Sequence, residues 1–541
     1  MSIFRLSFFK ITKMGAEWIK KGKSSENLIL FVVFVYLCFN FLFANILSGN
    51  EQDILPLAKQ AMDKAWIKND WTLNLGSGYR RLFNILFGLL ARFLSLPVVS
   101  IIGRLIIFFL FGYLFKEYAR VFKLKYYLVL PFLFLYLRYN NIIAGEWILG
   151  GLETKVFSYF FVLLSLLFLM EKKYFRFFLF LGLGISFHVL IGIYGVLCFL
   201  MAITINLVSF KTDLRMFFRN AYVLPVTASF GIYSIIQNAA SSLTHGLKET
   251  DYTVVFRNPS ITTPLFWQGK WILRLVLTVS FLLAVFLISR EKKIKICSFF
   301  GFSSILFFGI GLVLFKFDQI AYLKYFWFRF PDVILPLFSF MLFFVFMSRA
   351  ADFLASQNVF RTKRLYIKVI VIEAMFIILS GLLLIQGGMK FVKSYVLLAR
   401  QGEFFYLSDV EPDLKEALIW IRTNTPKESI FLTSPMIDKF RVATERAQFV
   451  SFKLYPVLGE FVPEWFRRIK LCNNNQDLKI FERGLKEIMD NNFYSMEENF
   501  IRKLTKDYGV DYYLAKSNMD YSFTRLYENK SYTLYNLKSY L

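Results

Sequence analysis

The sequence has few of the residues that cross-link small secreted domains or hold metal ions. Its 541 residues include four cysteines and two histidines. Cys38, Cys198 and Cys297 lie within apolar stretches, and only Cys472 lies in a polar one. This scatter excludes a disulfide framework and metal-ligand spacing. The chain also has no internal repeat and no low-complexity linker.

Acidic residues are scarce as well. The chain has 38 Asp and Glu against 64 Lys and Arg, which gives a formal net charge of +26. An excess of this kind is a feature of many nucleic-acid-binding proteins. Here the basic residues stand mostly between apolar runs, which is typical of the cytoplasmic flanks of membrane spans. We therefore expect no nucleic-acid partner.

What the chain has in abundance is apolar sequence. Hydrophobic residues make up 57% and aromatic residues 19%, and the mean hydropathy is +0.50. These values predict a multi-span membrane protein whose partner is the lipid bilayer. The first run, residues 28–47, is about 20 residues long and lacks a small-residue cleavage site, so we expect a retained helix. Six basic residues precede it and place residues 1–27 in the cytoplasm: Arg5, Lys10, Lys13, Lys20, Lys21 and Lys23.

Further apolar runs with alternating basic flanks predict an all-α polytopic membrane domain over residues 28–389. It should contain about eleven transmembrane helices, with the N-terminus inside and the C-terminus outside. After the first run, the expected spans are 98–115, 127–141, 156–170, 177–188, 191–210, 221–239, 271–289, 296–315, 333–346 and 369–385.

The first outer loop, residues 48–96, contains two stretches that are too short or too polar to span. Residues 54–66 have apolar side chains at helical spacing, which predicts an amphipathic helix on the outer surface. Residues 79–93 are apolar but carry three arginines, and we expect a second juxtamembrane helix there.

From about residue 390 the sequence becomes polar, and residues 390–541 are long enough for one small soluble domain. Helices are expected at 413–422, 478–489 and 499–506, and strands at 429–433, 448–452, 511–515 and 532–535. This alternation predicts a small C-terminal α/β domain outside the membrane.

Two carboxylates follow the first span directly. Glu51 and Asp53 should emerge at the outer membrane surface, where a carboxylate can act as a general base on a lipid-anchored substrate. The structural alternative is that Asp53 caps the juxtamembrane helix and that Glu51 is a solvated loop residue.

A second group of charges lies in residues 144–155, at the outer mouth of two spans. Glu146, Glu153 and Lys155 stand beside Gly150 and Gly151, which permit a close approach of a ligand to the backbone. Ionisable groups at the edge of a bilayer core face a cavity or pair with one another. The group therefore predicts a substrate-binding site, or else an ion pair of Lys155 with Glu146 or Glu153 that only fixes the loop.

Four further residues are candidate ligands of the substrate. His188 lies between two apolar runs at the predicted outer boundary, where the alternative is a structural histidine. Arg104 is a charge inside the second span that faces a cavity or a carboxylate, or stabilises packing. Arg446 and Lys453 stand in the soluble domain and suit phosphate binding, although a solvated basic face explains them equally well.

Taken together, these segments resemble the GT-C superfamily, the integral-membrane glycosyltransferases that use polyprenyl-phosphate-linked sugars. The resemblance covers about residues 28–470. It rests on the acidic residues after the first span, the juxtamembrane helices, the outer domain and the segments AGEWILGGLETK, FHVLIG and WIRTNTPKESIFLTSP…ERAQFVSFKLYP…EWFRR, which look like a bacterial branch of the superfamily. Members often carry Asp-Glu or Asp-Asp in the first loop. Here the order is Glu-Gln-Asp, which leaves the base open between Glu51 and Asp53.

The resemblance implies an inverting transferase in the bacterial inner (plasma) membrane, with its C-terminal domain periplasmic or extracellular. It would move a sugar from a polyprenyl-phosphate carrier to a glycan, lipid or protein acceptor. Some members use a divalent cation (Mg or Mn) between acid and phosphate and others do not, and the sequence leaves this open. Two rival hypotheses are a transporter or flippase for a lipid-linked or anionic substrate and a non-catalytic protein of the same fold.

Overall fold

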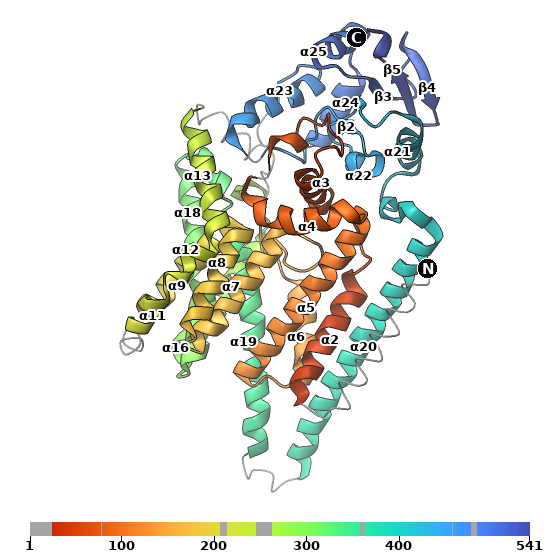
Figure 1. The fold of residues 1–541 in the computed structure, drawn as a ribbon. Helices are drawn as coiled ribbons and strands as arrows, with labels where there is room; N and C mark the ends of the chain where they lie inside the picture. The colour runs from red at the N-terminus through yellow and green to blue at the C-terminus, as the bar shows by residue number, and fades with distance from the viewer. Residues whose placement is uncertain are drawn as a thin grey trace.

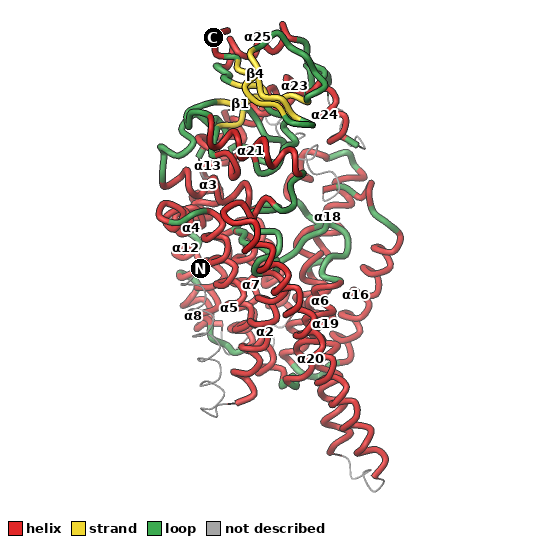
Figure 2. The backbone as a smooth tube through the Cα atoms, turned by 90° about the vertical axis from the view of Figure 1, so that its right-hand side faces the viewer, coloured by secondary structure: helices red, strands yellow, loops and turns green. Residues whose placement is uncertain are grey.

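The computed structural model describes residues 24–76, 78–205, 214–244, 262–356, 363–456, 458–477 and 484–540. Helices form a long bundle, and a small unit with a five-stranded sheet sits at one end of it (Figures 1 and 2). We call this small unit the C-terminal unit. The mostly helical architecture with a C-terminal sheet confirms the coarse fold expected from the sequence. Most of the predicted cytoplasmic segment 1–27 lies outside the described residues.

Apolar helices dominate the bundle. Among the described residues, five are long and apolar enough to cross a membrane: Leu96–Phe122, Gly269–Ile288, Lys292–Lys316, Arg329–Phe353 and Val371–Leu407. Five shorter apolar helices accompany them: Asn27–Phe41, Tyr126–Arg138, Thr154–Met170, Tyr174–Phe187 and Val189–Thr204. These helices overlap every predicted span except 221–239, where the chain forms two pieces, α12 (Val223–Thr227) and α13 (Ser229–Thr244). The total of about eleven spans stays a prediction.

The bundle elements have the following bounds: α2 (Ser24–Phe41), α5 (Leu96–Phe122), α6 (Tyr126–Arg138), α7 (Thr154–Met170), α8 (Tyr174–Phe187), α9 (Val189–Ile205), α11 (Leu214–Asn220), α16 (Gly269–Ile288), α17 (Lys292–Ser303), α18 (Ile305–Lys316), α19 (Arg329–Ser356) and α20 (Lys363–Gln401). Short 3-10 turns lie at Pro264–Phe266 and Ile320–Tyr325. The predicted domain boundary at 389/390 falls inside α20, which continues as one helix of 39 residues.

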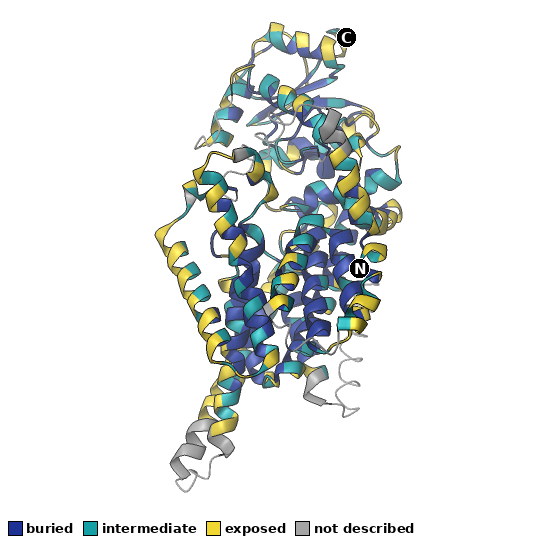
Figure 3. Ribbon diagram, turned by 90° about the vertical axis from the view of Figure 1, so that its left-hand side faces the viewer, coloured by how far each residue is buried: buried dark blue, intermediate teal, exposed yellow. Residues whose placement is uncertain are grey.

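The core runs along the axis of the bundle, and the outlying helices are exposed (Figure 3). α7 is buried along almost its whole length, whereas α16 and α20 leave most of their apolar side chains exposed. In a chain this apolar, such exposed faces suit contact with lipid.

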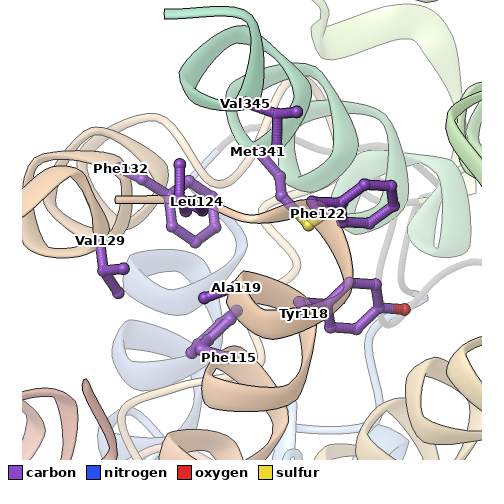
Figure 4. Close-up of a pocket in the computed structure, with 9 residues that line it drawn as sticks. All are labelled: Phe115, Tyr118, Ala119, Phe122, Leu124, Val129, Phe132, Met341 and Val345. Atoms are coloured by element: carbon purple, nitrogen blue, oxygen red, sulfur yellow. The ribbon is translucent and has the colours of Figure 1, made fainter. Parts of the chain in front are cut away.

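Packing between α5, α6 and α19 is tight. The cavity that remains there measures only ≈ 10 Å³, about the room that one water needs (Figure 4). This part of the bundle interior therefore has no space for a ligand. The lining is apolar apart from the Tyr118 hydroxyl: Phe115, Tyr118, Ala119, Phe122, Leu124, Val129, Phe132, Met341 and Val345.

Both juxtamembrane helices are present between α2 and α5. They are α3 (Glu51–Met62) and α4 (Arg81–Phe93), joined by 3-10 turns at Leu73–Leu75 and Gly78–Arg80. They touch closely at Gly88, where an added Cβ would lie 2.1 Å from the Ala58 carbonyl oxygen. On its other side α4 exposes an apolar stripe that includes Leu89 and Phe93, which is typical of a helix that lies in a membrane interface.

The C-terminal unit has a mixed sheet of order β2-β1-β3-β5-β4. β2, β1 and β3 are parallel, and β5 pairs antiparallel with β3 and β4. Its elements are η6 (Gly402–Leu407), α21 (Pro412–Asn424), β1 (Ile430–Leu432), α22 (Phe440–Thr444), β2 (Ala447–Gln448), η7 (Gly459–Phe461), α23 (Val462–Cys472), α24 (Leu485–Tyr494), α25 (Glu498–Tyr508), β3 (Tyr512–Lys516), β4 (Thr524–Glu528), β5 (Tyr532–Asn536) and η8 (Lys538–Tyr540).

Every helix and strand predicted in this unit overlaps an observed one. The predicted helix 478–489 is observed only from Leu485, because residues 478–483 lie outside the described part. The predicted strand 448–452 overlaps β2 only at Gln448. β4, α22 and α23 were not predicted. β4 is an edge strand with mostly exposed side chains, so it lacks the apolar alternation that marks a half-buried strand.

Candidate functional site

Glu51 begins α3 and is buried at the junction of α2, α3 and α5. Its carboxylate accepts hydrogen bonds from two backbone amides, those of Leu47 (3.0 Å) and Leu152 (2.5 Å). It also accepts one from the Ser100 hydroxyl (2.9 Å) and two from the Arg104 guanidinium, each 2.8 Å long. Both oxygens are therefore fully engaged by the protein.

Arg104 lies in the middle of α5 and is 1% exposed. Besides Glu51, it donates to the carbonyl oxygens of Phe41 (2.8 Å), Ala44 (2.5 Å) and Asn45 (3.0 Å). A guanidinium has five N–H donors, and these contacts use all of them. The predicted intramembrane charge thus faces a carboxylate, and the pair ties the end of α2 to α3 and α5.

Asp53 lies two residues further along α3 and is only half-buried. Its negative charge acts on Arg80, which lies in the 3-10 turn before α4. Burial lowers the pKa of Arg80, but Tyr79, Asp53 and Glu153 outweigh this effect and raise the pKa above its usual value. The charges of Asp53 and Glu153 thus act on the same cation, Arg80.

The charged stretch 144–155 forms buried ion pairs, as one of the two interpretations of the sequence expected. Lys155, in the first turn of α7, lies 2.9 Å from Glu146 and 3.2 Å from Glu153. Arg329, at the start of α19, donates to Glu146 over 2.5 Å. Burial pushes the pKa of Glu146 upward, but Arg329 and Lys155 hold it below its ordinary value.

Asp332 holds the backbone of this loop in place. Its carboxylate accepts hydrogen bonds from the amides of Ile142 (2.6 Å), Ile143 (2.6 Å) and Glu146 (3.0 Å). Asp332 is one turn along α19 from Arg329. The start of α19 therefore fixes both the path of the loop, through Asp332, and the position of the Glu146 carboxylate, through Arg329.

His188 stands at the break between α8 and α9, where its extended backbone ends α8. The Tyr79 ring packs edge-on against the imidazole, with centroids 5.2 Å apart. Arg80 donates to the Tyr79 hydroxyl over 3.0 Å. Charges on Arg329, Glu146, Arg80 and Lys155 all act on His188, so the histidine belongs to the same site.

These contacts bring together seven ionisable side chains that are scattered through the sequence, and we call them the charged cluster: Asp53, Arg80, Glu146, Glu153, Lys155, His188 and Arg329. Three of its atoms, Glu146 Oε1, Glu153 Oε1 and Arg80 Nε, are buried and make no hydrogen bond among the described residues, although Glu146 Oε1 lies 2.9 Å from the Lys155 ammonium. A buried polar atom without a hydrogen bond destabilises the folded protein. Such atoms are found at sites where a ligand, ion or water supplies the missing bond. The Arg329 side chain is 21% exposed, so part of this cation is accessible.

Arg446 does not join the cluster. Its guanidinium donates to Thr425 and to the carbonyl oxygens of Arg422, Thr444 and Glu445, over 2.5–3.2 Å. These partners all lie in the C-terminal unit and take up its donors. The other basic candidate there, Lys453, lies in the loop after β2 and is half-buried. The expected phosphate-binding role of Arg446 is therefore not favoured, because local carbonyl groups already occupy its N–H groups.

Sequence reasoning missed Arg80, Arg329 and Asp332 as site residues. Arg80 was interpreted only as part of a juxtamembrane helix, and the other two stand just before or within an apolar run. The available signal was the general one, that an ionisable residue at the edge of a membrane span faces a cavity or a partner. The residue types alone do not identify the side chain with which each of these residues pairs.

Metal ions in proteins are held by sets of ligands that converge on one point. Within the described ranges, no group of three or more His, Cys, Asp and Glu side chains is placed to hold a metal ion. The cluster carboxylates Glu146 and Glu153 are paired with cations instead. We therefore derive no step that passes through a divalent cation.

Comparisons with known proteins give limited matches. Residues 412–472 match a family model described as "Domain of unknown function (DUF6798)". No curated protein matches the sequence at a significant level. Among solved structures, the chain is similar to the archaeal oligosaccharyltransferase AglB from Archaeoglobus fulgidus, solved in complex with an inhibitory peptide and a dolichol-phosphate. The identity is 10% and the TM-score 0.42, and the match covers 92% of this chain and 70% of that one. A likeness at this level says nothing of this chain's activity.

Proposed function

We propose that the protein is an inverting membrane glycosyltransferase of the GT-C type, acting outside the cytoplasmic membrane on a polyprenyl-phosphate-linked sugar. The observation that carries the proposal is the charged cluster, in which the charge of Asp53 acts on Arg80 while Lys155 and Arg329 pair with Glu146. Cations and a half-buried carboxylate in one cluster suit a substrate with an anionic phosphate and a hydroxyl nucleophile.

The cations act on the leaving group. As the bond between the anomeric carbon and the phosphate oxygen breaks, negative charge builds on the phosphate. Arg80, Lys155 and Arg329 stabilise that charge, and Arg is suited to bidentate contact with phosphate. A lipid phosphate is already a good leaving group, so the step needs no general acid. The apolar helices around the cluster accommodate the lipid chain.

Asp53 takes the role of general base. It accepts the proton of the acceptor hydroxyl while the hydroxyl oxygen attacks the anomeric carbon from the face opposite the phosphate. Glu51 is unsuited to this role because both of its oxygens already accept hydrogen bonds from the protein. Of the two candidates that the sequence leaves open, the proposal therefore assigns the base to Asp53.

The test is Asp53→Asn, which keeps the size of the side chain and removes its basicity. The variant is reconstituted in proteoliposomes with a radiolabelled polyprenyl-phosphate sugar, and acceptor-bearing membranes are added. The rate at which polyprenyl phosphate is released should be roughly 10²–10⁴-fold lower than with the unmodified protein. Asp63→Asn is the matched control, since Asp63 follows the same helix and accepts only a local amide bond from Ala65. Full release of polyprenyl phosphate by Asp53→Asn at equal expression would overturn the assignment of Asp53 as the base, whereas no release by the unmodified protein would favour a transporter.

A second variant tests the phosphate contact. Arg329→Gln should raise the KM for the lipid-phosphate donor by about tenfold or more, because a charged hydrogen bond of about 1.5–3 kcal/mol is lost. The KM for the acceptor should stay the same. Arg176→Gln is the control, since Arg176 is an exposed residue of α8. Equal rises in both KM values would show a general loss of structure instead of a donor contact.

A further inference from the structure

A large polar groove lies between the segment that joins α2 to α3 and the C-terminal unit. Its volume is ≈ 760 Å³, within the range of sites that hold small molecules. Ser48, Gly49 and Gln52 form one wall, and residues from α21, α24, β3 and β5 form the others. Gln52 adjoins the proposed base Asp53 in the chain, so a ligand in the groove lies beside the turn of α3 that carries this residue.

Hydrogen bonds between the two parts of the chain hold the walls of the groove in place. The Ser48 hydroxyl donates to Asp409 over 2.9 Å, and the Gln52 amide donates to Asp438 over 2.9 Å. Lys439 pairs with Asp409 and donates to the Tyr406 carbonyl oxygen over 2.7 Å. The groove is therefore a built feature of the fold and not a gap between loosely placed parts.

The charges that line the groove nearly cancel. Its four carboxylates are Asp409, Glu411, Asp438 and Asp490, and its three ammonium groups are Lys439, Lys486 and Lys516. The whole chain, by contrast, carries a formal charge of +26. The lining thus has one carboxylate more than it has ammonium groups, which disfavours a phosphate or another polyanion. Its many donors and acceptors favour a neutral, polar ligand.

Two tyrosines, Tyr494 and Tyr532, also border the groove. The Lys516 ammonium lies 3.9 Å from the centre of the Tyr532 ring and 5.5 Å from that of Tyr494. The Tyr532 hydroxyl donates to Glu411 over 3.3 Å. Lys486 and Lys516 both act on Asp490, whose carboxyl accepts a hydrogen bond from Ser434. Carboxylates and ammonium groups that are held in place in this way match the many hydroxyl groups of a sugar.

We propose that this groove binds the acceptor and that the acceptor is a neutral oligosaccharide. The proposal rests on the proposed function, because it names the acceptor of the same transfer reaction. The groove orients the saccharide so that one hydroxyl reaches Asp53, while the phosphate of the donor lies on the cations of the charged cluster. The acceptor hydroxyl then approaches the anomeric carbon of the donor from the side opposite the phosphate.

The experiment measures binding directly and does not depend on turnover. The full-length protein in nanodiscs is titrated with maltotriose, cellotriose and triacetylchitotriose, and saturation-transfer NMR reports contact with the protein. Hyaluronan and chitosan oligomers of similar length serve as an anionic and a cationic probe. We expect saturable signals from at least one neutral trisaccharide and at least tenfold weaker binding of both charged probes.

Asn491→Trp tests the location of the site. Asn491 is an exposed lining residue of α24, so the large ring fills the groove without entering the core. Trisaccharide binding should be lost. Glu487→Trp places the same ring at an exposed position of the same helix that does not line the groove, and binding should persist.

The two proposals fail separately. No saturable binding of any neutral trisaccharide, tighter binding of a charged probe, or unchanged binding by Asn491→Trp would overturn the groove proposal. None of these results affects the donor reaction. Conversely, failure of the unmodified protein to release polyprenyl phosphate from the donor would overturn the proposed function while leaving the trisaccharide-binding result intact.

Discussion

Replacing Glu51 by Ala is expected to prevent stable folding, and this is the largest effect that the structure predicts. The change leaves the Arg104 guanidinium buried without its counter-charge and removes the acceptor of five hydrogen bonds. Removing one partner of a buried ion pair lowers the free energy of unfolding by about 3–5 kcal/mol. The measurement is the yield of monodisperse protein by size exclusion, together with its melting temperature in detergent.

A double variant separates charge from packing in this pair. Glu51→Met with Arg104→Met removes both charges at once, so the double variant should recover much of the stability that Glu51→Ala loses. If Glu51→Ala instead folds with an unchanged melting temperature but is inactive, then Glu51 takes part in the reaction and the anchoring role is wrong.

The second large effect is expected at the junction between the two parts of the protein. Asp70, in the loop between α3 and α4, is fully buried and lies 2.6 Å from Arg441 of α22. It also accepts hydrogen bonds from the amides of Leu73 (3.0 Å) and Gln448 (3.1 Å). Asp70→Ala leaves Arg441 buried without its partner and should cost about 3–5 kcal/mol.

This loss should appear as local opening. Peptides from residues 63–76 and from β2 should exchange their amide hydrogens faster in the Asp70→Ala variant, while peptides from α7 keep their protection. Asp63→Ala is the control, because Asp63 lies in the same loop and accepts only the local bond from Ala65. Unchanged exchange at β2 would show that the ion pair does not hold the C-terminal unit in place.

The helices could be predicted because their signal is local. A run of apolar residues bounded by basic ones specifies a membrane helix without reference to the rest of the chain. The structure accordingly contains helices at nearly all predicted positions. The interrupted pair α12 and α13 was missed because composition alone does not show where a backbone breaks.

The site could be predicted only in part. Residues 144–155 stood out because charges and glycines are dense there, and their ion pairs were among the expected outcomes. The partners Arg329 and Asp332 come from a distant helix, and no local pattern announces such a contact. The surroundings of Arg446 could not be predicted for a related reason, since its donors are taken up by carbonyl groups that only the folded backbone brings close.

The length of α20 has a mechanical consequence. Its 39 residues make a rod of roughly 58 Å at 1.5 Å per residue, nearly twice the ~30 Å of a bilayer's hydrocarbon layer. The rod passes through η6 directly into the unit that carries the sheet. We expect a change in its tilt, imposed by a thicker or thinner membrane, to load the hydrogen bonds that join that unit to the start of α3, from Ser48 to Asp409 and from Gln52 to Asp438.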